Sequence, residues 1–173
     1  MKKSLQITQT AVLVAMLVLL QSVTKAGGQL VTGSCVNMVL AVAALLFGIW
    51  TGVAVAVISP FLAFMLGIGP QIIAIIPAIA VGNVIYVLLL HFLSSKKNLP
   101  VWRQGSGLLC AAVSKFLALY LIVAQLLCRI LPLPAKQVAT FTTMFSWPQL
   151  ITALIGGAVA LLVVPVLRKA FRR

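Results

Sequence analysis

The sequence predicts an all-α membrane protein, a six-helix transmembrane bundle that forms a single membrane domain over residues 1–173. The 173-residue chain is 63% hydrophobic and only 8% charged. Its long apolar stretches are separated by short polar breaks, which is typical of polytopic helical membrane proteins. Most cations flank these stretches instead of forming a basic stripe with aromatics, so the pattern does not indicate a nucleic-acid partner.

We expect the membrane spans at approximately residues 5–23, 35–50, 52–68, 71–93, 105–131 and 147–167. The first stretch is long enough to cross a bilayer at about 1.5 Å per residue. A signal peptide is the rival interpretation, since Lys2 and Lys3 precede an apolar core. The polar residues at the start of that core and Lys25 after it argue against cleavage.

The second and third stretches are short, each about 24 Å long as a helix. They form either two short spans or one re-entrant hairpin, and we expect Pro60 to kink the third. The polar break at residues 24–34 contains several glycines. It either brings backbone amides and hydroxyls close to a ligand or is a plain connecting loop.

The fourth stretch is interrupted by Pro77 and Asn83. Asn83 is either a pocket residue or a partner in an interhelical hydrogen bond. We expect loops at residues 94–104 and 132–146, on either side of the fifth stretch. Pro148 is expected in the first turn of the sixth helix, where proline is well tolerated.

The fifth stretch carries Lys115 near its middle, with Gln125 and Arg129 further along. A cation at that depth costs roughly 2.5–3.5 kcal/mol, and the chain contains no Asp or Glu to pair with it. The counter-charge of Lys115 is therefore a ligand, a lipid, another subunit or water reached by snorkelling. At about 3.6 residues per turn the three side chains share one polar stripe, which favours an inward face.

The distribution of cations places both termini in the cytoplasm by the positive-inside rule. With six spans, the inner side carries Lys2, Lys3, Lys96, Lys97, Arg103, Arg168, Lys169, Arg172 and Arg173. The outer side carries only Lys25, Arg129 and Lys136. Four spans with a re-entrant hairpin would keep the same parity, and we favour six.

The absence of acidic residues excludes several chemistries. The chain has no carboxylate pair for acid–base catalysis, no oxygen cage for Mg²⁺ or Ca²⁺, and no P-loop motif. Cys35, Cys110 and Cys128 are far apart, and His91 is the only histidine that could join them. We therefore predict neither a metal nor another cofactor, and we expect another chain to supply energy for any uphill transport.

Three motifs carry a family resemblance. Ala11-Val-Leu-Val-Ala15 forms an AxxxA pattern in the first span, Gly48-Ile-Trp-Thr-Gly52 joins the second and third, and a glycine-containing run leads to Gly69-Pro70. With these motifs, its size and its topology, nearly the whole chain resembles the substrate-binding S components of energy-coupling-factor (ECF) vitamin transporters. It departs from many such relatives in lacking acidic residues, which bears on the substrate and not on the class.

The resemblance implies a non-enzymatic subunit of an ABC importer in the plasma membrane of a prokaryote. Such a subunit captures a vitamin or related micronutrient from outside and docks, here through Ala11 and Ala15, on a transmembrane coupling subunit driven by two ATPase subunits. The family's pocket lies in the outer half of the membrane. By depth, the implied substrate-binding residues are Thr32, Ser34, Asn37, Gln71, Gln125, Arg129, Trp147 and Gln149, and we add Asn83 and Lys115 from the spans themselves.

The free cations favour a ligand that bears a carboxylate or phosphate, and hence an anionic or zwitterionic micronutrient. Helical side chains lean toward the amino end of their helix, so we expect Lys115 to point toward the cytoplasm. There it would snorkel or contact the coupling subunit, although a direct ligand role stays open. Arg129, at the outer end of the stripe, is the better-placed anion anchor.

Two other functional classes are alternatives. A membrane-embedded enzyme, such as a transferase, would have to use His91, Lys115 or the cysteines. A structural membrane subunit would bind no small molecule at all. Polar residues near one side of the membrane, with no coupling acid and no nucleotide site, favour a receptor over both.

Overall fold

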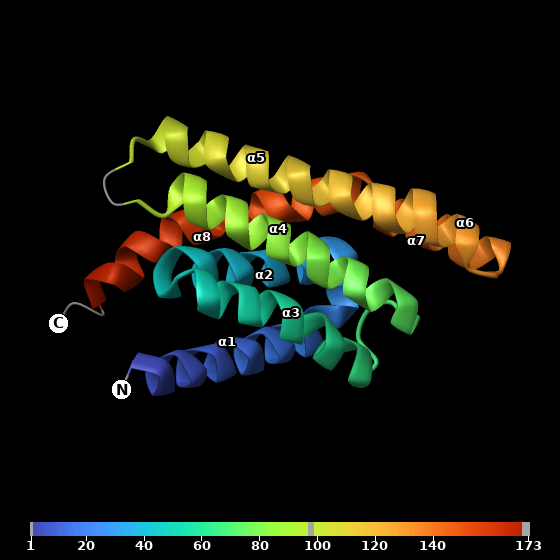
Figure 1. Ribbon diagram of the computed structural model, residues 1–173, viewed down its shortest axis with the longest axis horizontal. Coiled ribbons are helices and arrows are strands. Elements are labelled where there is room, and N and C mark those ends of the chain that lie inside the picture. The colour runs from blue at the N-terminus through green and yellow to red at the C-terminus, as the bar shows by residue number, and fades with distance from the viewer. Residues whose placement is uncertain (1, 97–98, 171–173) are drawn as a thin grey trace.

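The computed structural model describes residues 2–96 and 99–170, which fold into helices with no strand among them (Figure 1). The first half of the chain contains α1 (Lys2–Thr24), a 3₁₀ turn (Lys25–Gly27), α2 (Gly28–Val42) with a π-helical end (Ala43–Phe47), and α3 (Ile49–Met65). A 3₁₀ turn (Ile73–Ile75) then leads into α4 (Ile76–Ser94). The second half contains α5 (Val101–Leu119), continued by a π-helical segment (Tyr120–Leu127) and α6 (Cys128–Ile130), followed by α7 (Ala135–Met144) and α8 (Trp147–Ala170).

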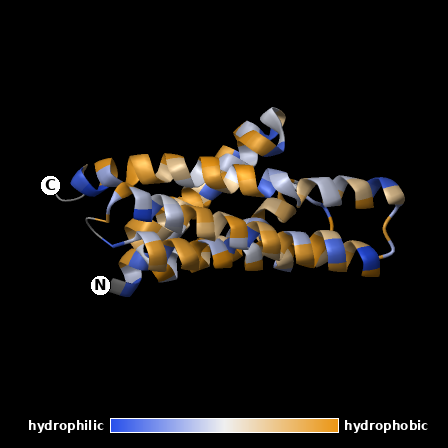
Figure 2. Ribbon diagram, turned by 90° about the horizontal axis from the view of Figure 1, so that it is seen from above, coloured by the Kyte–Doolittle hydropathy of each residue, from blue (hydrophilic) through white to orange (hydrophobic). Residues whose placement is uncertain are grey.

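The helices are long and apolar enough for a multi-pass membrane protein. Four stretches of the described chain qualify as membrane spans by length and hydropathy, and α3 is a shorter apolar helix. These four are Lys3–Phe47, Ile73–Ser94, Val101–Ile130 and Ala135–Ala170. Hydrophobic residues cover most of the length of the bundle, and hydrophilic residues gather chiefly at its ends (Figure 2).

The longest of these stretches reverses direction at Gly28, so it contains the antiparallel helices α1 and α2 (Figure 1). Gly28 has a positive backbone angle φ of 76°, which residues other than glycine rarely adopt. The loop expected over residues 24–34 is therefore wrong in extent, because helix resumes at Gly28. The Thr32 hydroxyl donates to the Thr24 carbonyl at 2.8 Å and fastens the turn.

The core is built by close approach of small residues. Ala153 and Ala160 of α8 are fully buried, and α8 packs extensively on α2. A Cβ at Gly156 would collide with the Ser34 carbonyl oxygen and with the Met38 amide nitrogen at 2.6 Å. Glycine at position 156 thus lets α8 touch the backbone of α2.

Three expected boundaries were wrong, each for a local reason. α4 begins at Ile76 and not near residue 71, because Pro77 fits a first helical turn but not a helix interior. α5 begins at Val101, directly after Pro100, inside an expected loop. The expected loop at residues 132–146 contains α7, whose Phe141 is buried in a core cluster with Phe145.

Candidate functional site

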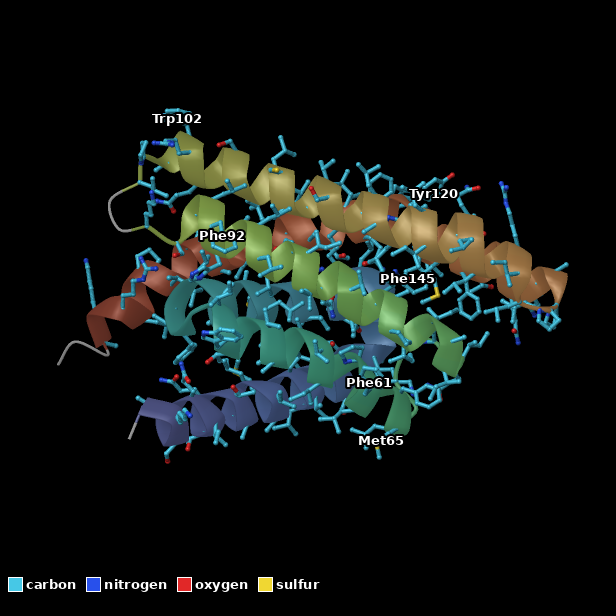
Figure 3. All side chains as sticks on the ribbon, viewed as in Figure 1. Phe61, Met65, Phe92, Trp102, Tyr120 and Phe145 are labelled. Atoms are coloured by element: carbon cyan, nitrogen blue, oxygen red, sulfur yellow. The ribbon has the colours of Figure 1, made fainter. Side chains whose placement is uncertain are left out.

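A cavity of about 250 Å³ opens in the half of the bundle away from both termini. Its walls come from the α1–α2 turn, the second half of α3, the α3–α4 loop, the start of α4, the end of α5 and the α7–α8 junction. Phe145, one of its lining residues, lies in this half of the molecule, whereas Trp102 projects from the bundle near the opposite end (Figure 3). The lining is mostly apolar with a few converging polar groups, as in many small-molecule sites.

Lys115 reaches this cavity from near the end of α5, which is the middle of the continuous helical stretch Val101–Ile130. Its side chain is only 2% exposed, and its ammonium donates to Asn37 Oδ1 at 2.6 Å and to Asn83 Oδ1 at 2.8 Å. The same nitrogen lies 5.3 Å from the centre of the Tyr86 ring, close enough for a cation–π contact. The ammonium is enclosed by α2, α4 and α5, so the expected snorkelling toward the cytoplasm was wrong.

Asn37 is held so that its oxygen faces the ammonium. Its amide nitrogen donates to the Gly33 carbonyl at 2.9 Å and to Thr152 Oγ1 at 3.2 Å. Thr152, itself 1% exposed, donates in turn to the Gln149 carbonyl at 3.2 Å. This chain of bonds from α8 through α2 to α5 fixes both the asparagine and the lysine before any ligand arrives.

The charge of Lys115 is solvated by these groups but not neutralised. Amide oxygens and an aromatic face carry only partial negative charge, and the chain contains no Asp or Glu. An ammonium has three N–H donors, and two of them meet the asparagines. The site therefore holds a buried ammonium, and one of its three N–H donors is not used by the bonds to the asparagines.

Further polar groups surround the cavity. Gln21 Oε1 is buried and accepts no hydrogen bond from any described residue. Ser59, 1% exposed, lines the α3 side. At the mouth, Lys25 donates to the Gly67 carbonyl at 3.0 Å and Gln29 donates to the Met144 carbonyl at 2.6 Å. These two bonds tie the α1–α2 turn to the α3–α4 loop and to the end of α7.

The structure brings half of the ten candidate substrate-binding residues together. The five that line the cavity are Thr32, Asn37, Asn83, Lys115 and Gln149. The five that lie outside its lining are Ser34, Gln71, Gln125, Arg129 and Trp147. Gln71 and Trp147 are exposed, and Ser34 bonds back to the Leu30 carbonyl within α2.

Arg129 does not share the inward face of Lys115. It is exposed and donates to Gln125 Oε1 at 2.6 Å, and Gln125 donates to the Tyr120 hydroxyl at 2.8 Å. The reason is the π-helical segment Tyr120–Leu127, which has more residues per turn than an α-helix. A face projected from Lys115 at α-helical spacing is lost beyond Tyr120, so the expected polar stripe was wrong.

Sequence reasoning missed Gln21 and Ser59 as cavity residues. Gln21 sits near the end of a long apolar run, where a lone glutamine is a usable signal for an inward polar group. Ser59 directly precedes Pro60, where a serine can simply accompany a proline kink, so its position gave no separate signal of a cavity. Both positions are set by helix packing, which decides the face that a single polar residue occupies.

Ala11 and Ala15 lie on the outward side of α1. Both are exposed, whereas Leu13 and Leu17 of the same helix are buried against the bundle. Ala11 also lines a second hollow of about 780 Å³ between α1 and α3, beside the exposed Trp50. This face of α1 is thus free for contact with another membrane helix.

Comparison with known proteins identifies the class. Searches of characterised proteins and of solved structures gave no significant match. The family described as ECF transporter, substrate-specific component matches residues 5–168, nearly the whole chain. Members of this family are substrate-binding transporter subunits that associate with an ECF module, and they are not enzymes. The chain belongs to the substrate-specific components of ECF transporters.

Proposed function

We propose that this S component captures a small anionic or zwitterionic vitamin-like micronutrient in the cavity around Lys115. The observation that carries the proposal is a buried ammonium with no acidic side chain anywhere in its chain. Burying an unpaired charge is costly, and the protein retains one where the cavity reaches it. A ligand carboxylate or phosphate supplies the missing negative charge.

The proposal assigns the cavity to the outer face of a prokaryotic plasma membrane. The chain would cross the membrane six times with both termini in the cytoplasm, as the excess of inner cations favours. The two termini lie at one end of the bundle and the cavity lies toward the other, which agrees with this orientation (Figure 1). Lys25 at the mouth adds positive charge that attracts an anion.

Delivery would follow docking on the transmembrane coupling subunit and its two ATPase subunits. The exposed Ala11 and Ala15 are the proposed contact, because small side chains let membrane helices approach closely. Replacing Ala11 with leucine should weaken assembly with the coupling subunit and leave ligand binding by the isolated chain unchanged.

Mass spectrometry of small molecules that co-purify with the protein tests the proposal. The wild-type chain and Lys136→Met, which removes an exposed lysine of α7, should both retain the same anionic or zwitterionic compound. Lys115→Met should retain none. Recovery of only a neutral or purely cationic compound from the wild type would contradict the proposed ligand class.

A further inference from the structure

The two asparagines beside Lys115 are not equivalent. Asn37 uses its amide nitrogen twice within the protein, toward the Gly33 carbonyl and Thr152 Oγ1. Asn83 also gives its oxygen to Lys115, at 2.8 Å, but its amide nitrogen donates to no other described residue. Since Asn83 lines the cavity, that nitrogen is a donor beside the third N–H of Lys115. Two neighbouring donors match the two oxygens of a carboxylate.

Gln21 presents the opposite kind of group from α1, which lies on the other side of the bundle from α5 (Figure 1). Its Oε1 is buried without a partner among the described residues. Buried acceptors in proteins almost always receive a hydrogen bond, and each exception calls for an explanation. The explanation that fits a cavity wall is a hydrogen-bond donor on the bound molecule.

The remaining wall is mostly apolar, although Thr32, Ser59 and Gln149 also line it, and the cavity is small. Ile76, Ile79, Val36 and Phe145 are among its lining residues. Its volume of about 250 Å³ exceeds the roughly 150 Å³ of an engineered cavity that takes up benzene. The space thus suits a compact body of about one ring or an equivalent branched chain.

We infer that the ligand is a small carboxylate with a hydroxyl or N–H group on the part that faces α1, and that Gln21 selects for this donor. Lys115 and Asn83 bind the carboxylate, and Gln21 Oε1 accepts from the donor. The inference rests on the proposed function, because it refines the ligand of the same cavity. It makes Gln21 a specificity-determining residue, whereas Asn37 positions the ammonium.

The test uses a library of small metabolite carboxylates, each paired with an analogue that lacks only the distal hydroxyl or amine and with one whose carboxylate is replaced by an amide. Binding to the full-length protein in detergent or nanodiscs is measured by thermal shift and then by titration. The wild type should prefer the donor-bearing carboxylate by at least about tenfold in Kd. Gln21→Met, which keeps the side-chain length, should bind both carboxylates with nearly equal affinity.

Gln125→Met is the matched control, since Gln125 is likewise a glutamine of an apolar helix but lies outside the cavity and has hydrogen-bond partners of its own. It should keep the wild-type preference. Equal binding of the paired carboxylates to the wild type, or a preference that survives in Gln21→Met, would overturn the inference and leave the proposed function standing. Wild-type protein that binds no carboxylate of the library would also overturn the inference, and wild-type protein that binds the amides as tightly as the carboxylates would overturn the proposed function itself.

Discussion

Lys115 and Arg168 are both cations without an acidic partner in this chain, yet their surroundings differ. Arg168, near the end of α8, donates to the Leu45 carbonyl at 2.6 Å and to the Ser95 carbonyl at 3.3 Å. Those carbonyls lie at the ends of α2 and α4, where helix dipoles concentrate negative charge. Lys115 meets Asn37 and Asn83 in mid-helix, far from such ends.

The difference distinguishes a structural cation from one that, under the proposed function, meets a ligand. At the end of the bundle near the termini, the orphan carbonyls of helix ends require donors in any case, and His91 contributes there too, 2.9 Å from the Ala44 carbonyl. Arg168 therefore supplies hydrogen-bond donors that the helix-end carbonyls of Leu45 and Ser95 require. The asparagine oxygens that Lys115 meets do not require a cation, because an uncharged hydrogen-bond donor could satisfy them equally well.

The largest expected effect comes from giving Lys115 an internal partner. Asn83→Asp places a carboxylate within reach of the ammonium, so the protein neutralises its own site and loses a donor to the ligand. We expect the affinity for the anionic ligand to fall by roughly a hundredfold or more, measured by titration. The ligand-free protein should melt no lower than the wild type. Gln125→Glu, which adds the same charge outside the cavity, should bind the ligand as the wild type does. A normal affinity in Asn83→Asp would show that Lys115 does not supply the ligand's counter-charge.

Removing the structural cation should have the opposite profile. Arg168→Met leaves the Leu45 and Ser95 carbonyls without this donor, and we expect a loss of stability of about 1.5–3 kcal/mol with ligand affinity changed by less than about threefold. Thermal unfolding and titration of the same preparations measure both. Lys169→Met removes an exposed neighbour and should alter neither. A large loss of affinity in Arg168→Met, at unchanged stability, would mean that both cations serve the ligand.

A smaller effect is expected from the residue that positions Asn37. Thr152→Val keeps the shape but removes the acceptor for the Asn37 amide, so the asparagine and Lys115 become less well fixed. We expect a loss of affinity of roughly threefold to tenfold, about 1 kcal/mol. Thr152→Ser should restore it, because serine keeps the hydroxyl. Failure of serine to rescue binding would show that Thr152 acts through packing alone.

Much of the fold could be predicted from the sequence because membrane helices are set by long apolar runs and proline positions. The helix α7 could not, since its polar threonines obscure the spacing of Val138, Phe141 and Phe145, which pack in one cluster. Gly28 likewise allows a reversal in three residues where a longer loop was expected.

The candidate site was predicted only in part, for a similar reason. Lys115, Asn37 and Asn83 stand out because polar groups are costly in mid-membrane. Arg129 was expected on the same face as Lys115, but the π-helical segment after Leu119 changes the helical phase, and sequence alone does not mark that change. Gln21 could be recognised as a site residue only after helix packing was known, because packing places the cavity beside it.

The most direct test of the account is a titration of Lys115→Met with the anion that co-purifies with the wild type, beside Lys136→Met as control. We expect Lys115→Met to lose at least about a hundredfold in affinity while its ligand-free melting temperature stays equal or rises, because a buried charge has been replaced by an apolar chain of similar length. Lys136→Met should bind as the wild type does. Wild-type affinity in Lys115→Met would contradict the claim that this ammonium is the ligand's counter-charge.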